Sequence, residues 1–145
     1  MTPTQLTAFK AAILADVSLV AQRAAGDHGA IAAYYNGAGT GTIWRPSITL
    51  LELNTAIVWS EYTVLSALLQ NTYMAMIQGG TVDATAAGIR AGFTAVFAGK
   101  VSLTNLTAMA QIVPTKFQQL FAVAQVSATF GQSVAVSDIA AALGS

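Results

Sequence analysis

The chain has 145 residues, of which 54% are hydrophobic and only 8% are charged, and its six basic residues balance its six acidic ones. This composition argues against a disordered chain, which needs low hydrophobicity and high net charge. It provides no basic excess to neutralise phosphates, so no specific nucleic-acid recognition is expected. Because the chain has no cysteine, it cannot form disulfide bonds, thiolate zinc sites or a cysteine nucleophile.

The length suits one domain over residues 1–145. Two uncharged windows, residues 62–82 and 117–137, raise the question of a membrane span, but polar residues interrupt both. A spanning helix needs roughly 18 or more predominantly apolar residues. The N-terminus also lacks the basic region and apolar core of a signal peptide. We therefore expect no membrane segment. We expect instead that much of the surface is buried against other subunits, because monomers seldom expose large apolar patches.

Capping residues and apolar spacing predict a helical N-terminal region. Thr2 is suited to open a helix, because it precedes a proline and lies three residues before a glutamine. Phe9, Ile13 and Val17 then recur at helical spacing and form the predicted core face. Residues 18–25 either extend this helix or form a second one.

The next elements also follow from local signals. A short helix is predicted over residues 30–35. Residues 42–46 are expected to be extended, since the residue before a proline avoids the helical conformation. Thr49 and Glu52 then form a capping box, which predicts a helix over residues 50–58, with an end as late as Trp59 left open.

In the second half, a helix predicted over residues 64–77 has a core face that includes Leu68 and Tyr73. Asp83 is the predicted cap of the following helix, residues 84–98. The remaining predicted helices span residues 103–111 (capped by Ser102), 115–122 and 139–143.

The pattern changes near the C-terminus. Val126, Ala128 and Phe130 alternate with polar or small residues, as do Val134 and Val136, which is typical of two short strands or an extended arm. The sequence therefore predicts a mainly α fold, a compact multi-helix domain with a short β element or extended arm near the C-terminus.

Gly88 and Gly92 lie four residues apart on the helix predicted over residues 84–98. Each helical glycine costs about 1 kcal/mol relative to alanine. Their spacing therefore suggests the close approach of another backbone. The alternative is that the helix simply tolerates the two glycines, with no close approach of another backbone.

No residue pattern points to catalysis. His28 is the single histidine and is expected in a loop or a first helical turn. The glycine-rich residues 37–41 lack the flanking strand, the following helix and the Gly-Lys-Ser/Thr ending of a phosphate loop. Four acids lie at predicted helix starts, where the helix dipole favours anions. They are Asp27, Glu52, Asp83 and Asp138. We therefore predict no catalytic residue, cofactor site or metal site, and a protein that is not an enzyme.

An interaction role is expected at two aromatic clusters instead. Trp44 and Arg45 are of types enriched among interface hot spots, and Trp59 with Glu61 forms a second candidate cluster. The alternative is that Trp44 covers the core of its own domain beside a solvated Arg45. In the interface hypothesis, Arg45 with Glu52, or Arg90 with an acid of a neighbour, would suit pairing between subunits. The predicted interface residues are Trp44, Arg45, Trp59, Gly88, Gly92 and Phe130.

A pattern spread over most of the chain matches that of a known family. The matching segments are Ile13-Leu14-Ala15-Asp16, residues 30–33, Ile43-Trp44-Arg45-Pro46-Ser47-Ile48-Thr49 with Glu52 three residues on, Ile89-Arg90-Ala91-Gly92-Phe93, residues 106–121 and residues 134–143. In these segments the chain resembles a family of small structural proteins encoded by tailed bacteriophages. It departs from that pattern at Ile112, where relatives carry arginine, and at Gln118, where they often carry glutamate.

The resemblance implies a virion protein that is assembled in the host cytoplasm. Among virion parts, it favours a head-to-tail connector (adaptor) that forms a homo-oligomeric ring of about twelve copies below the portal. The partners would be the portal and neck or tail proteins, with residues 123–145 as a docking arm. The alternative is another structural part, such as a tail-completion, minor tail or capsid-associated protein. An enzyme, a small-molecule binder and a membrane-associated protein are the other classes considered.

Overall fold

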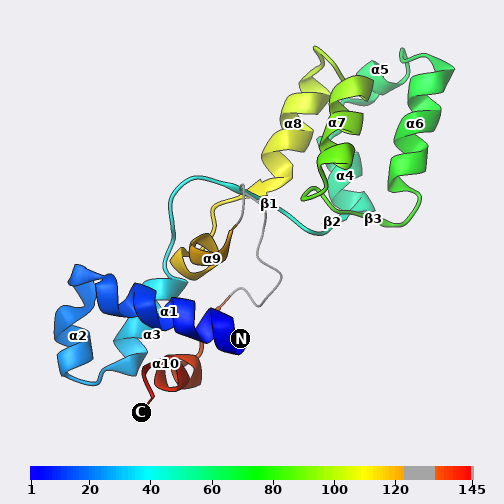
Figure 1. The fold of residues 1–145 in the computed structure, drawn as a ribbon. Coiled ribbons are helices and arrows are strands. Elements are labelled where there is room, and N and C mark those ends of the chain that lie inside the picture. The colour runs from blue at the N-terminus through cyan, green and yellow to red at the C-terminus, as the bar shows by residue number, and fades with distance from the viewer. Residues whose placement is uncertain (123–132, 145) are drawn as a thin grey trace. The chain divides into compact units, whose positions relative to one another are not determined.

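The computed structural model describes residues 1–122 and 133–144 of the chain (Figure 1). Within them the chain forms two compact units. The terminal unit contains residues 1–41, 113–122 and 133–144, and the inserted unit contains residues 42–112. The mainly helical fold that the sequence predicts is confirmed. That residues 1–145 form a single domain stays a prediction.

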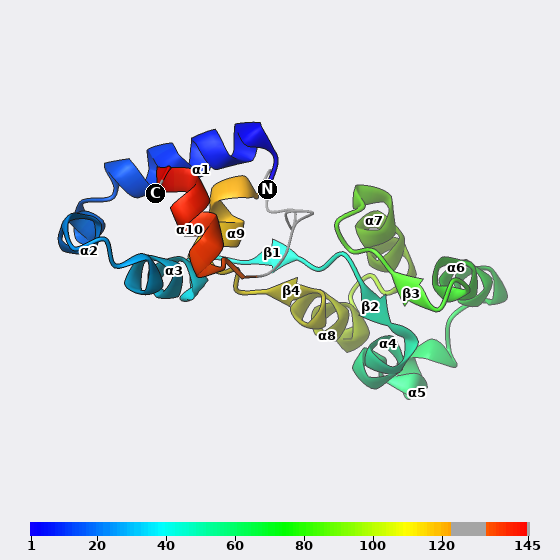
Figure 2. The same cartoon turned by 90° about the horizontal axis from the view of Figure 1, so that it is seen from below.

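The terminal unit is built from five α-helices and one 3-10 helix among its described residues. They are α1 (Pro3–Ala15), η1 (Val17–Leu19), α2 (Val20–Ala24), α3 (His28–Asn36), α9 (Lys116–Phe121) and α10 (Val136–Leu143). In Figures 1 and 2, α10 lies against α1 and α3, and α9 packs on α3. Phe9 is at the centre of the core, with its ring 5.0 Å from the rings of both Tyr35 and Phe117.

Side-chain caps set the helix starts of the terminal unit. Thr2 and Gln5 form the predicted capping box: the amide nitrogen of Thr2 donates to the Gln5 side chain at 2.8 Å, and that of Gln5 donates to the Thr2 hydroxyl at 3.2 Å. The Asp27 carboxylate accepts from the amide of Ala30 at 2.8 Å and so begins α3. These caps depend on residues only three apart, which is why the sequence reveals them.

The inserted unit contains five helices and four two-residue strands. They are β1 (Ile43–Trp44), β2 (Ile48–Thr49), α4 (Leu50–Ala56), α5 (Trp59–Tyr62), α6 (Ala67–Ile77), β3 (Thr81–Val82), α7 (Ala87–Val96), α8 (Val101–Met109) and β4 (Gln111–Ile112). β1 pairs antiparallel with β4, and β2 pairs antiparallel with β3. Because β1 and β4 are its first and last elements, the chain enters and leaves this unit side by side (Figure 2).

An aromatic cluster around Tyr73 forms the core of the inserted unit. The Tyr73 ring lies 5.6 Å from that of Tyr62 and 5.4 Å from that of Phe97. Tyr73 is 1% exposed, and burial raises the pKa of its hydroxyl to about 12. Among the described residues this hydroxyl has no hydrogen-bond partner.

Two residues predicted on core faces are exposed. Val17 is 86% exposed, because α1 ends at Ala15 and a separate 3-10 turn follows. Leu68 is 74% exposed, because the inward stripe of α6 runs through Tyr73 and Ile77 and leaves Leu68 on another face. Helical periodicity finds an apolar stripe, but it cannot say which apolar residues lie just off it.

Several helix limits also differ from the prediction. α4 ends at Ala56, and Trp59 begins a separate helix, α5. α7 begins at Ala87, because Asp83 instead closes a turn by accepting from the amide of Thr85 at 2.8 Å. Each difference lies at a helix end, where competing local hydrogen bonds decide the boundary.

The predicted C-terminal strands are not supported where the structure describes the chain. Residues 126–130, the first predicted strand, lie outside the described residues. Val136 begins α10 rather than a strand, and Val134 is buried. The Asn36 side chain holds Val134 by donating to its carbonyl at 2.9 Å and accepting from its amide at 2.7 Å. The described part of the predicted arm therefore belongs to the terminal unit, and its docking role on a partner stays a prediction.

Candidate functional site

Trp44 lies on β1 at the start of the inserted unit and is half-buried. Its side chain packs against the core of that unit, which matches the alternative in which it covers its own domain. The guanidinium carbon of Arg90 lies 5.0 Å from the centre of the indole ring. This geometry is that of a cation–π contact. Part of the Trp44 ring is therefore engaged within its own unit.

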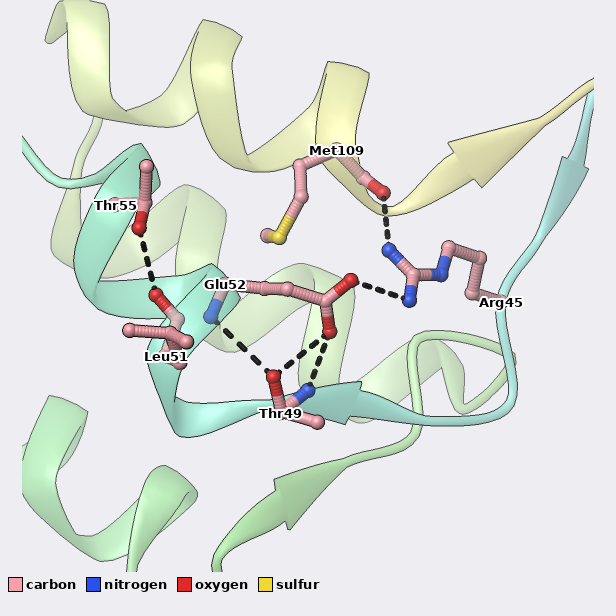
Figure 3. A network of polar contacts seen from close by, with 6 residues as sticks. All are labelled: Arg45, Thr49, Leu51, Glu52, Thr55 and Met109. Carbon is pink, nitrogen blue, oxygen red and sulfur yellow. Dashed lines mark hydrogen bonds and ion pairs between the residues drawn. The ribbon is translucent and has the colours of Figure 1, made fainter.

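Arg45 makes several hydrogen bonds within the inserted unit and is not a solvated side chain (Figure 3). Its Nη2 donates to Glu52 Oε1 at 2.6 Å, and its Nη1 donates to the carbonyl of Met109 at 3.2 Å. Its backbone nitrogen donates to the carbonyl of Ala110 at 2.9 Å, and its own carbonyl accepts from the amide of Ala84 at 3.0 Å. The Arg45–Glu52 pair, predicted between subunits, forms within one chain.

Glu52 serves two purposes at the start of α4. Its Oε2 accepts from the amide of Thr49 at 2.8 Å and from the Thr49 hydroxyl at 2.9 Å, which completes the predicted capping box (Figure 3). Its Oε1 binds Arg45. The backbone hydrogen bond from Thr49, followed by the Arg45 contact, lowers the pKa of Glu52 to about 2. The carboxylate is therefore ionised over a wide pH range.

Trp59 is half exposed, and other apolar side chains on segments bonded to its helix are exposed as well. We define the Trp59 surface as Trp59, Val64, Leu68 and Val101, with exposures of 50%, 71%, 74% and 58%. They come from α5, the turn after it, the first turn of α6 and the start of α8.

Hydrogen bonds tie these three helices together. The Glu61 carboxylate on α5 accepts from the amide of Val101 at 2.9 Å. The side chain of Gln70 on α6 donates to the carbonyl of Tyr62 at 3.1 Å. The Trp59 surface is thus carried by segments that are bonded to one another.

The two glycines of α7 have different surroundings. A Cβ built on Gly92 would lie 2.6 Å from the sulfur of Met76 on α6, whereas one on Gly88 would meet nothing within 4 Å. The close approach at Gly92 is therefore to a side chain of the same unit and not to another backbone. Gly88 lies on the exposed side of the helix. Phe130, the remaining predicted interface residue, lies outside the described residues.

Carboxylates cap backbone groups throughout the chain. Besides the residues predicted to do so, Asp16 accepts from the amide of Ser18, and Glu61 accepts from the amides of Val101 and Ser102 at 2.9 Å. The hydrogen bonds to Ser102 and Val101 lower the pKa of Glu61. The sequence analysis places Glu61 in a cluster with Trp59 and misses its capping role, because it caps a helix about forty residues further along and no local motif indicates that pairing.

The remaining candidates have local structural roles. His28 is the first residue of α3, in the first helical turn as predicted. In the glycine-rich loop, the amide of Gly39 donates to the carbonyl of Pro114 at 2.8 Å. A Cβ on Gly39 would lie 3.2 Å from that carbonyl oxygen, so glycine allows the close approach. Within residues 1–122 and 133–144, no three metal-ligating side chains gather.

No family model, curated protein or solved structure matches the chain. In the described part of the chain, no single helix is long and apolar enough to span a membrane, although α1 and the following segment Val17–Ala24 meet that test as a pair bent by 77°.

Proposed function

We propose that the protein is a structural component of a tailed-bacteriophage virion, a head-to-tail connector that forms a homo-oligomeric ring below the portal. The proposal begins from the resemblance of segments such as residues 43–49 and 106–121 to small phage structural proteins. The observation that carries it is a surface with few free charges and large exposed apolar side chains.

Most of the charged side chains form hydrogen bonds within their own chain. Nine of the twelve, all six acids and three arginines, bind backbone groups of their own chain. Arg23, for example, donates to the carbonyls of Ile13 and Leu14 at the end of α1. Few charged side chains therefore remain without a hydrogen bond to the backbone of their own chain.

The Trp59 surface supplies a contact of the kind that a ring requires. Large apolar side chains at 50–74% exposure are expected to be covered in the working assembly. Trp is enriched among interface hot spots. In a cyclic ring each subunit presents one surface to a different surface of its neighbour, which closes the assembly without requiring self-complementarity. The Trp59 surface is proposed as one half of such a contact.

The test is a double substitution on the Trp59 surface, Trp59→Ser with Leu68→Ser, introduced into the phage genome. The expected result is a folded protein, by circular dichroism, that is lost from purified particles, with heads and tails left unjoined in electron micrographs. Val17→Ser is the matched control, because Val17 is 86% exposed but lies in the terminal unit.

Two outcomes would contradict the proposal. One is normal incorporation of the double variant, which would remove the Trp59 surface from the assembly. The other is the absence of the wild-type protein from purified particles by mass spectrometry. The copy number distinguishes a ring of about twelve subunits from a shell or tube component, which would be present in far larger numbers.

A further inference from the structure

A small cavity in the inserted unit has the features of a recognition pocket. Its volume is about 200 Å³, and β1, α7 and α8 contribute to its wall. The side chains that matter for its chemistry are Trp44, Arg90, Phe93, Leu106, Thr94 and Thr107. An apolar cavity of about 150 Å³ holds one benzene ring. This pocket therefore has room for one ring-sized group.

The polar part of the wall favours an anion. Arg90 and Trp44, both in the wall, carry N–H groups that donate hydrogen bonds and cannot accept them. No acidic residue lines the pocket. Arg90 also carries the positive charge of the wall.

Two hydrogen bonds hold the guanidinium of Arg90 in place, and both use only its Nη1 nitrogen. Its Nη1 donates to the carbonyls of Ala84 at 2.8 Å and Thr85 at 2.6 Å, which fixes the group above the Trp44 ring. Within residues 1–122 and 133–144 its Nη2 and Nε make no hydrogen bond. Donors that are already oriented bind a carboxylate with little further loss of side-chain freedom.

We propose that this pocket receives a ring-sized apolar side chain next to an aspartate or glutamate on a partner protein. The apolar part would lie against Phe93 and Leu106, and the carboxylate would face Arg90. We take the partner to be a different protein, because each of the six acids of this chain already accepts a backbone amide of its own chain and would have to leave or share that amide to bind Arg90. The identity of the partner as a neighbouring virion protein rests on the proposed function.

The test is an NMR titration of the full-length ¹⁵N-labelled chain, whose two tryptophans provide two indole signals. The probes are the peptides acetyl-Phe-Asp-amide and acetyl-Phe-Asn-amide, together with phenylacetate as a free acid. The aspartyl peptide should shift the Trp44 indole signal saturably and leave that of Trp59 in place. The asparaginyl peptide should bind about fivefold more weakly, since hydrogen bonds to a charged group are the stronger ones.

A pair of variants on α8 tests the location. Thr107→Phe places a ring in the pocket and leaves Arg90 itself unsubstituted, whereas Thr104→Phe adds the same ring to an exposed position of the same helix that does not line the pocket. Thr107→Phe should abolish the Trp44 shift, and Thr104→Phe should preserve it.

Three results would overturn the proposal. They are no saturable shift with the aspartyl peptide, equal binding of both peptides, or binding of phenylacetate without binding of the aspartyl peptide. The last would assign the pocket to a free small acid. These readouts use the isolated chain. A failure of the connector function would appear instead as absence of the protein from particles, so the two failures are distinguishable.

Discussion

At the scale of single residues, charged side chains here act mainly as anchors for the backbone. Arg45 and Glu52 show this most clearly, because together they bind Thr49 at the start of α4 and Met109 at the end of α8. The Trp-Arg pair looked like a hot spot in the sequence, but the structure uses its arginine to tie the inserted unit together.

Glu52 should give the stability of the protein a specific acid dependence. Its pKa falls from an ordinary 4.5 to about 2 on folding. The carboxylate therefore stabilises the fold fully above about pH 4.5, and this contribution is lost as the pH falls towards 2. Glu52→Gln should lower the melting temperature at pH 7 and weaken its decline between pH 4.5 and 2, as measured by circular dichroism.

Part of that decline should survive in the variant, because the pKa of Glu61 is also lowered. Wild type and Glu52→Gln with parallel melting temperatures from pH 7 to pH 2 would mean that the Arg45–Glu52–Thr49 contacts do not form in solution.

The two glycines of α7 offer a matched pair of substitutions. Gly88→Ala should stabilise the isolated chain by up to about 1 kcal/mol, because alanine favours the helix and the added methyl meets nothing within 4 Å. Gly92→Ala should gain less or destabilise, because its methyl would displace Met76. Urea denaturation measures both. Equal gains would show that Met76 does not pack on Gly92.

At the scale of elements, the start of α8 depends on α5. Ser102 was predicted to cap this helix, but it lies within α8 and is fully buried. Its hydroxyl donates to Glu61 at 2.7 Å and accepts from the amide of Val58 at 3.0 Å. The buried Ser102 hydroxyl thus links the Glu61 carboxylate on α5 to the backbone amide of Val58, the residue just before that helix.

Ser102→Ala should therefore destabilise the chain by about 1–3 kcal/mol, the usual cost of leaving a buried polar group without a partner. Ser60→Ala on α5 is the control, because Ser60 is exposed, and it should change stability by no more than about 0.5 kcal/mol. The free energy of unfolding in urea is the measurement. Similar values for the two variants would contradict the buried network.

At the scale of the whole molecule, the chain carries one helical unit inserted into another. The inserted unit begins and ends on paired strands, with Ile43 opposite Ile112 and Trp44 opposite Gln111. It also has its own aromatic core around Tyr73. A segment with a separate core and adjacent ends has what a folding domain needs.

Residues 42–112 expressed alone should therefore fold, with helical circular dichroism and a cooperative thermal transition. A fragment of residues 50–112, which lacks β1, Arg45 and β2, should melt lower or stay unfolded. If the longer fragment shows no cooperative transition, the inserted unit depends on the terminal unit, and the single domain predicted from the sequence describes the chain better.

The sequence by itself determined what depends on neighbours along the chain. The mainly helical fold, the capping boxes at Thr2 and Thr49, and the extended Trp44 segment all follow from residues within a few positions of one another. Hydrogen-bond caps and backbone preferences act at that range, so a single sequence contains the information.

Only the tertiary structure decided which distant groups meet. It placed Glu61 at the start of α8, directed Arg45 to Glu52 and Met109, and left Leu68 exposed. Such contacts depend on how helices pack, and many pairings of the same residue types satisfy the same local patterns. Packing therefore decided which backbone groups these distant charges bind, whereas the low charge on which the proposed assembly depends is already set by the composition.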